Sequence, residues 1–422
     1  MSMQEIENFK QLSCLPKFEG GRVEKICDIG DDYAQVTVFE TTAEMLENYK
    51  TALEGAGYVL YASMSKGNFT SYTLTQQNHM VHIYRAGYSG ETRIVAAFDA
   101  LLPARETPTY EKVCEVSYTA LASLGKEGNP TGDSLGGVLQ LEDGTFILYD
   151  GGYGNFPAGE QIYKVLKKLA KDDEIVIRAW VLSHLHWDHT GGFYQFVKAV
   201  EKGIFTGVTV ESFIYNLCNT PEQSECLYCG DTDFERIAKG IACFPEAPVY
   251  KCLTGQEFFF PGVRMEVLSC MSDFVPRVIG YEFPDAEKDK GDGNATSIVV
   301  RFLTENGKNL MLTGDANCTL LDDMCLRFED HIKTDIMTMP HHALNKPTYR
   351  ARNATRLFYD YTRPDICFLP SASDARLGDQ GFTTNEVNVY LQEKYHPAIL
   401  LADAPRTVRL SDGTILGEMK LE

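Results

Sequence analysis

Four potential metal ligands crowd one short segment of the sequence. His184, His186, Asp188 and His189 follow the apolar run 175–182, which is broken only by one arginine and predicts a buried β-strand. In α/β proteins, ligand sites commonly lie at the carboxyl ends of strands. In an extended segment, alternate residues such as His184 and His186 can face the same side. Asp188 and His189 can then turn toward a second position. Imidazole and carboxylate groups together suit zinc, iron or manganese.

Two later segments end in residues of the same kind. Residues 309–312 predict an apolar strand that runs into Gly314 and Asp315, where a carboxylate could bridge two metal ions. The run that starts at Asp335 predicts a further strand, which leads into His341 and His342. Five of the chain's 9 histidines lie in the first and last of these three segments. This concentration favours a metal site over incidental turns.

The elements around the histidine segment predict how it is held. Residues 137–141 and 146–149 flank a Glu-Asp-Gly-Thr turn typical of a β-hairpin, and the second strand runs into Asp-Gly-Gly at 150–152. A helix-like run, 193–202, follows the histidines. The glycines at 191–192 are expected to let the backbone turn tightly and approach the site. Strands and helices then alternate to the C-terminus, which is typical of sheets covered by helices.

The N-terminal part predicts a small unit of a different kind. Residues 35–39 form a strand-like run, and Thr41 and Glu44 have the spacing of a helix capping box. The helix that follows is expected to end near Gly57, which suits a C-cap. Four more strand-like runs follow, at 58–64, 71–75, 80–84 and 92–98. This order predicts one helix packed on an antiparallel sheet.

A domain boundary is expected in the segment 102–112, which carries two prolines and several charges. We therefore expect residues 1–110 to form a small α+β domain of unknown role. Residues 111–422 are expected to form the catalytic domain that carries the candidate metal ligands.

Composition excludes several classes of protein. The chain has 422 residues, 44% hydrophobic and 23% charged, which is typical of a globular protein rather than a disordered or fibrous one. Its formal net charge is −20, which makes long nucleic acid and anionic membrane surfaces poor partners. No apolar stretch is long enough to span a bilayer, and the N-terminus lacks the pattern of a secretory signal.

The 12 cysteines have no framework spacing, so free thiols and a cytoplasmic location are expected. Cys226 and Cys229 form a single CxxC, for which free thiols are favoured over structural zinc.

At these residues the chain resembles the metallo-β-lactamase superfamily. It looks most like the hydrolase domain of DNA-internalisation competence proteins and their free-standing relatives, over about residues 114–422. The matching sequences are the histidine segment, the Asp-Gly-Gly turn, Asn-Ala-Thr-Ser at 294–297, Leu-Thr-Gly-Asp at 312–315, Met-Pro-His-His at 339–342 and the C-terminal run 401–414.

The resemblance implies an α+β fold, the αββα sandwich, with a two-metal site at one edge. It implies that His184 and His186 hold one ion, that Asp188 and His189 hold the other, and that Asp315 bridges them. His341 or His342 would complete the second site or donate to the substrate's anionic oxygen. We assign His341 to the metal ligands, and Asp188 and His342 to catalysis. Two divalent ions are expected, with zinc favoured over manganese and iron.

The chain departs from the superfamily pattern at three places. No histidine lies between His189 and His331, so the usual third histidine of the first metal is missing, and Asn216 or Cys218 could stand in. The His-His-Gly-Ser sequence of the competence-type relatives reads His-His-Ala-Leu here. Their later Gly-His-Pro sequence has no histidine in this chain, where Gln-Gly-Phe-Thr-Thr-Asn begins at 380.

The function expected from these residues is hydrolysis by a metal-activated water, which needs no serine or cysteine nucleophile. A phosphodiester or another small phosphoester is the favoured substrate. A carboxyl ester, lactone or lactam is the alternative within enzymes. A non-catalytic binding protein with a degenerate metal site is the alternative outside them.

Overall fold

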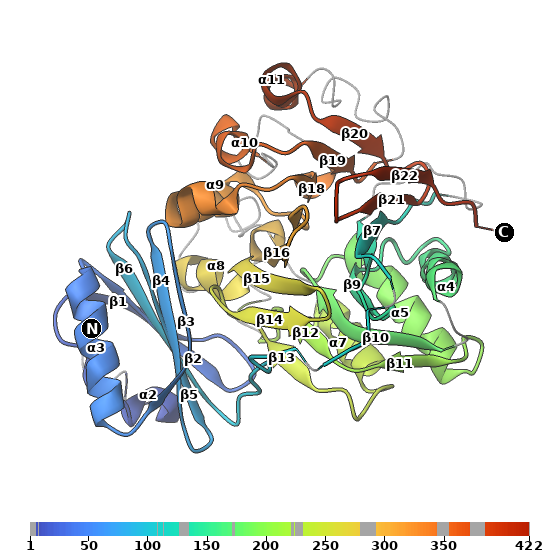
Figure 1. Cartoon of the computed structure of the whole chain (residues 1–422). Helices are drawn as coiled ribbons and strands as arrows, with labels where there is room; N and C mark the ends of the chain where they lie inside the picture. The colour runs from blue at the N-terminus through green and yellow to red at the C-terminus, as the bar shows by residue number, and fades with distance from the viewer. Residues whose placement is uncertain are drawn as a thin grey trace.

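Three β-sheets and the helices that cover them make up the fold of the computed structural model (Figure 1). The structure describes residues 8–107, 109–112, 114–125, 135–170, 174–220, 231–278, 293–343, 354–371 and 385–421, together with Ile6 and Gln223. The Cys226–Cys229 pair lies outside these ranges, as does the Gln-Gly-Phe-Thr-Thr-Asn segment except for its last residue, Asn385.

The N-terminal sheet is antiparallel and has six strands in the order β1-β2-β6-β5-β4-β3. Its strands are β1 (Arg22–Asp28), β2 (Tyr33–Phe39), β3 (Val59–Lys66), β4 (Phe69–Gln76), β5 (His79–Ala86) and β6 (Glu91–Phe98). Helix α3 (Ala43–Gly55) packs Leu46, Tyr49 and Leu53 on one face of this sheet, beside the short helix α2 (Lys10–Ser13). Burial of such an amphipathic helix face supplies most of its stability.

Two details of this unit differ from the sequence prediction. The N-cap of α3 is Thr42, whose side chain accepts a hydrogen bond from the Met45 amide, whereas the Thr41 hydroxyl donates to the Gly90 carbonyl. The sequence also did not predict β1. This strand lies at the sheet edge and carries charges on both faces, so it lacks the apolar alternation of a half-buried strand.

The second and third sheets stack face to face. The nine-stranded sheet contains β7 (Ser117–Ala120), β8 (Gly136–Gln140), β9 (Phe146–Asp150), β10 (Ile175–Leu182), β11 (Val208–Val210), β12 (Phe213–Tyr215), β13 (Val249–Lys251), β21 (Arg406–Arg409) and β22 (Ile415–Glu418). The seven-stranded sheet contains β14 (Glu257–Phe260), β15 (Val263–Ser269), β16 (Val299–Thr304), β17 (Leu310–Leu312), β18 (Ile336–Thr338), β19 (Ile366–Leu369) and β20 (Ala398–Leu401). Buried residues of both sheets, such as Val138 and Val300, form one core.

Helices cover the outer faces of both stacked sheets, so the layers run αββα as expected (Figure 1). Helices α4 (Ala158–Leu169), α5 (Trp187–Glu201) and α7 (Asp231–Ile241) cover the nine-stranded sheet. Helices α9 (Cys318–Phe328), α10 (Arg356–Thr362) and α11 (Glu386–Tyr395) cover the seven-stranded one. The prediction of an αββα sandwich is therefore confirmed.

Four neighbouring strands at one side of each stacked sheet are parallel. β9, β10, β12 and β13 run in one direction, and β17, β18, β19 and β20 are likewise parallel to one another. The carboxyl ends of parallel strands share one edge of a sheet. A hydrogen bond from the Ile298 amide to the Ser183 carbonyl, 3.0 Å long, joins the two sheets at that edge.

The N-terminal sheet packs against the sandwich through an apolar cluster and a buried ionic network. Phe69 and Tyr84 share a core with residues of β15 and α9. Beside them, Asp273 of α8 (Met271–Val278) pairs with Arg327 of α9 at 2.8 Å and with Arg93 of β6 at 3.8 Å. All three charged side chains are at most 4% exposed. Burial alone favours the neutral acid, but Arg327 and Arg93 outweigh it and lower the pKa of Asp273.

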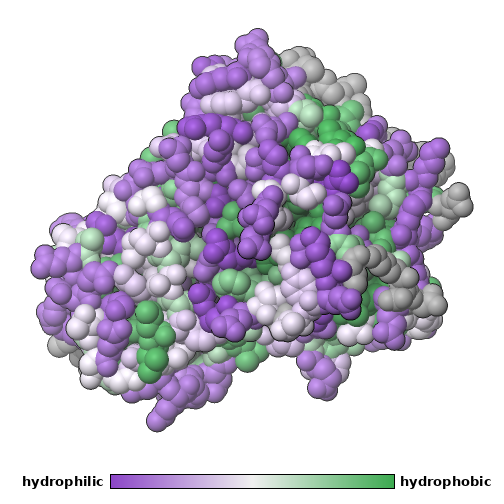
Figure 2. Space-filling view, viewed as in Figure 1, coloured by the Kyte–Doolittle hydropathy of each residue, from purple (hydrophilic) through white to green (hydrophobic). Residues whose placement is uncertain are grey.

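Hydrophilic residues dominate the visible surface, with hydrophobic ones in scattered patches (Figure 2). Within the described part of the chain, no helix combines the length and apolar character needed to cross a bilayer. The division into domains at about residue 110 stays a prediction.

Candidate metal centre

The predicted ligands come together where the parallel strands of the two stacked sheets end. His184 and His186 follow β10, while Asp188 and His189 lie in the first turn of α5. Asp315 follows β17. His342 lies in the 3-10 turn η4 (Pro340–Ala343) after β18.

These side chains form two groups that share Asp315. His184, His186 and Asp315 make the first group, and Asp188, His189, Asp315 and His342 make the second. Within each group, one donor atom from every residue lies within 4.8 Å of the others. In the second group, Nε2 of His342 is 3.2 Å from Asp188 Oδ2 and 3.3 Å from Asp315 Oδ2. A carboxylate shared by two clusters of donors could bridge two metal ions.

Three of the histidine rings are oriented by partners on their Nδ1 side. His189 Nδ1 lies 2.8 Å from Asp150 Oδ2, and His342 Nδ1 lies 3.0 Å from the Pro370 carbonyl oxygen. His184 Nδ1 lies 3.0 Å from the hydroxyl of Ser183. The Nε2 atom of each ring therefore faces the cluster. Fixing one ring nitrogen in this way sets the orientation and tautomer of a metal-binding histidine.

Asp150 is a site residue whose role the sequence analysis missed. It was interpreted only as part of a strand-end turn. In the structure, its Oδ1 accepts the Ser183 amide at 2.8 Å and its Oδ2 accepts the Ser183 hydroxyl at 2.7 Å, beside His189. Asp150 is 1% exposed. The available signal was a carboxylate at the end of a predicted strand.

Backbone strain helps to aim His342. His341, His342 and Ala343 have φ values of 47°, 58° and 57°, so three successive non-glycine residues are left-handed. Such a conformation costs roughly 1 kcal/mol or more per residue and persists only where the surroundings enforce it. Here the His341 amide donates to the Gly314 carbonyl at 3.1 Å, which ties the turn to the segment before Asp315.

The glycines at 191–192 act differently from the prediction. They lie inside α5 rather than in a tight turn, because α5 already begins at Trp187. They do permit a close approach, since a Cβ on Gly192 would lie 1.9 Å from the carbonyl oxygen of Gly151. The turn after β9 thus packs directly against the helix that carries Asp188 and His189.

Charges within the cluster shift the ionisation of its members in opposite directions. Burial disfavours the imidazolium form of His189, but Asp315, Asp188 and Asp150 outweigh burial and raise its pKa to about 10. The same balance raises the pKa of His342, through Asp315 and Asp188. Burial, followed by the neighbouring histidines, lowers the pKa of His184. His189 and His342 keep the pKa of Asp315 low despite its burial. Without a metal, the carboxylates are thus balanced by protonated histidines.

The donor atoms fit divalent metal ions. Nε2 of His184, His189 and His342 and Oδ1 of Asp315 are buried, and none makes a hydrogen bond. Nε2 of His189 lies 3.0 Å from Asp315 Oδ1, so the two atoms face each other across the cluster. Buried polar atoms normally have partners, and imidazole nitrogens with carboxylate oxygens are ligands of zinc, iron and manganese.

Two of the predicted participants lie beside the groups rather than in them. His341 Nε2 is 3.8 Å from Asp315 Oδ2 and 3.4 Å from the Asn294 side-chain amide, at the more exposed side of the cluster. Cys218 is buried after β12 and belongs to neither group of described residues.

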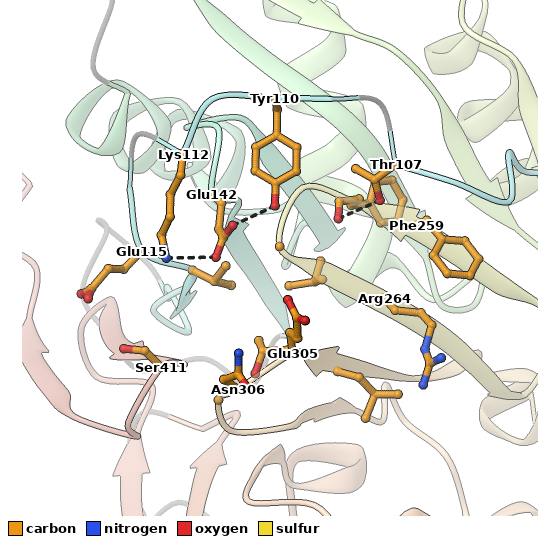
Figure 3. Close-up of a pocket in the computed structure, with 17 residues that line it drawn as sticks. Thr107, Tyr110, Lys112, Glu115, Glu142, Phe259, Arg264, Glu305, Asn306 and Ser411 are labelled. Atoms are coloured by element: carbon orange, nitrogen blue, oxygen red, sulfur yellow. Dashed lines mark hydrogen bonds and ion pairs between the residues drawn. The ribbon is translucent and has the colours of Figure 1, made fainter.

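A separate cavity of about 880 Å³ lies at a different part of the sandwich (Figure 3). Its lining includes Glu142, which accepts a hydrogen bond from Tyr110 and forms an ion pair with Lys112. Glu305, in the turn between β16 and β17, also lines it. None of the clustered histidines or carboxylates lines this cavity. It is therefore distinct from the candidate metal centre.

The segment that contains Asp150 and the first four candidate ligands is similar in sequence to a known superfamily. Residues 132–213 match the metallo-beta-lactamase superfamily. This match, together with the αββα layers, supports the superfamily part of the sequence-based resemblance. No curated protein matches the chain in sequence.

Two solved structures are similar in fold. The metallo-beta-lactamase fold protein YhfI from Bacillus subtilis is 12% identical, with a TM-score of 0.42, and the match covers 70% of this chain and 99% of that one. The isothiocyanate hydrolase from Delia radicum gut bacteria is 13% identical, with a TM-score of 0.35 and the same coverage. At these low values, the fold assignment rests on the sheet topology and on the family match.

Proposed function

We propose that this protein is a metal-dependent hydrolase that acts on a phosphodiester or another small phosphoester. The observation that carries the proposal is the pair of donor groups joined by the buried carboxylate of Asp315. His184 and His186 would hold one ion, and Asp188, His189 and His342 would hold the other. Zinc is the ion we expect, because each group combines two imidazole nitrogens with carboxylate oxygen.

Bound divalent ions would lower the pKa of a coordinated water to near neutrality and stabilise negative charge that develops on the substrate. Residues of the chain itself would accept the proton and bind the substrate. The Asp188 side chain is 31% exposed and Asp315 only 2%, so Asp188 is the carboxylate that the attacking water reaches and can give a proton to. His341, 16% exposed beside Asp315, is placed to donate to an anionic oxygen of the substrate.

The ligand assignment changes one point of the sequence-based expectation. We propose His342 as the ligand from the Met-Pro-His-His segment, because its Nε2 joins the second group. His341 then takes the substrate-binding role. This exchange follows from the left-handed turn, which directs the second histidine inward.

The small phosphoester is favoured by the resemblance to the competence-type hydrolases and by the net charge of −20, which repels long nucleic acid. We also propose a cytoplasmic location. None of the ten cysteines in the described ranges is joined in a disulfide, and seven of them are buried, which suits a reducing compartment.

Metal content and hydrolysis test this proposal together. Protein purified without chelators or affinity-tag metal is analysed by elemental mass spectrometry, and then assayed with zinc or manganese on bis(4-nitrophenyl) phosphate, 4-nitrophenyl acetate and a lactone. We expect two ions per chain and turnover of the phosphodiester, with both lost in Asp315→Asn and retained in the control His396→Ala, an exposed histidine. Turnover of the ester or lactone alone contradicts the phosphoester assignment. Metal binding without any turnover favours a binding protein.

A further inference from the structure

Asn216 lies at the end of β12, directly beside the strand that carries the first histidines. β12 is parallel to β10, with Tyr215 paired with Leu182, so Asn216 continues next to Ser183 at the shared carboxyl edge. The Asn216 side chain is fully buried, with 0% exposure. A buried amide needs partners for both its nitrogen and its oxygen.

The nitrogen of this amide is fully engaged, and the oxygen is not. Nδ2 donates to the Cys252 carbonyl oxygen at 2.8 Å, to the Ser272 hydroxyl at 3.2 Å and to the Cys270 sulfur at 3.4 Å. A carbonyl oxygen can only accept, so the contact with Cys252 fixes which amide atom is nitrogen. Oδ1 is buried and makes no hydrogen bond. Cys252 follows β13, on the opposite side of β12 from β10. Oδ1, on the other side of the amide, therefore points away from β13.

The first donor group is the smaller one. Among the described residues it offers His184, His186 and Asp315, whereas the second group offers four residues. Zinc in proteins takes four ligands, and an amide oxygen is a weak but competent donor to divalent ions. We propose that Oδ1 of Asn216 supplies an oxygen ligand to the ion held by His184, His186 and Asp315. This inference rests on the proposed function, because it requires that an ion binds there.

The partners of the Asn216 nitrogen are themselves held by the N-terminal sheet. Arg93 of β6 donates to the Ser272 carbonyl oxygen at 2.7 Å, and Asp273, the next residue, pairs with Arg327. The segment that carries Cys270 and Ser272 is thus anchored by buried charges. An amide held against an anchored segment is pre-organised, so binding an ion to its oxygen costs little ordering entropy.

Zinc titration and cobalt spectroscopy of the apoprotein test this inference. Asn216→Ala is expected to weaken one of two zinc sites by about tenfold or more, while the other site is unchanged. Its cobalt form is expected to show an altered visible absorption spectrum, because one ligand is lost. Cys218→Ala is the matched control, since Cys218 is the rival donor two residues along the chain. It is expected to bind both ions as the wild type does.

Asn216→Asp keeps the inference testable if Asn216→Ala does not fold, which thermal unfolding of the apoprotein reveals. The carboxylate offers a charged oxygen in the same position, so one zinc site is expected to tighten by about tenfold or more. Unchanged zinc affinities and an unchanged cobalt spectrum in the folded variants overturn the inference, as does loss of an ion in Cys218→Ala alone. If the wild type takes up no ion, the proposed function itself fails, and the inference fails with it.

Discussion

Asp150→Asn is the perturbation that tests most directly how the metal centre is built. Asp150 accepts three donors: the Ser183 amide, the Ser183 hydroxyl and, at 2.8 Å, His189 Nδ1. An asparagine of the same shape presents an NH₂ group in place of one carboxylate oxygen. The Ser183 amide can only donate, so the NH₂ group takes the place of Oδ2 and faces both His189 Nδ1 and the Ser183 hydroxyl. The tautomer of His189 is then no longer fixed.

Two magnitudes follow from these contacts. Loss of an acceptor behind a metal-binding histidine typically weakens metal binding 10- to 100-fold, or about 1.4–2.7 kcal/mol. A buried donor left without a partner costs the apoprotein about 1–3 kcal/mol of unfolding free energy. Both effects are expected here in full, because Asp150 and His189 have 0% exposed side chains.

Competitive zinc titration against a chromophoric chelator measures the first effect, and urea unfolding of the apoprotein measures the second. Asp143→Asn is a suitable control, because Asp143 is a hydrogen-bonded carboxylate in the turn at the other end of β9. It is expected to leave zinc affinity unchanged. Wild-type zinc affinity in a folded Asp150→Asn protein would refute the idea that this carboxylate orients His189.

Three further predictions concern protons, charges and packing. Because the pKa of His189 is raised to about 10, zinc must displace its proton at pH 7, so zinc affinity is expected to rise with pH. Calorimetry in two buffers of different ionisation enthalpy should detect release of at least one proton. Asp273→Asn removes the carboxylate that two buried arginines share, although Arg93 keeps Glu91 and Arg327 keeps Asp323 as partners, and it is expected to cost about 3 kcal/mol in urea unfolding. Because the pKa of Asp273 is lowered in the folded protein, its ionised form stabilises the fold at pH values above the ordinary aspartate pKa. This stabilisation is lost as the pH falls below that value. The melting temperature of the variant should therefore fall less steeply with decreasing pH than that of the wild type. Gly192→Ala would clash with the Gly151 backbone and should lower both stability and zinc affinity, whereas Gly55→Ala, with open space around it, should leave zinc affinity unchanged.

Local patterns predicted the strand ends that carry the ligands. The apolar run 175–182 became β10 with the expected bounds, and the runs before Asp315 and before His341 became the strands β17 and β18. These predictions succeeded because each depends on a short stretch of chain in which apolar residues give way to polar ones.

Features that depend on distant contacts could not be predicted in the same way. The role of Asp150 arises only when β9 pairs with β10 and brings the carboxylate beside His189. The inward position of His342 depends on a left-handed turn of non-glycine residues, which has no sequence signature. Helix α5 starts early because backbone from the β9 turn packs against the glycines at 191–192, which alone would suggest a break.

The ionic network around Asp273 has a consequence for dividing the chain. Cutting it in the proline-containing segment at 102–112 would leave Arg93 on one piece, and Asp273 and Arg327 on the other. Each piece would then expose apolar surface beside charged side chains that are at most 4% exposed in the intact chain. We expect neither piece to stay soluble when produced alone. Produced together in one cell, they should reassemble, because every partner in the network is still present.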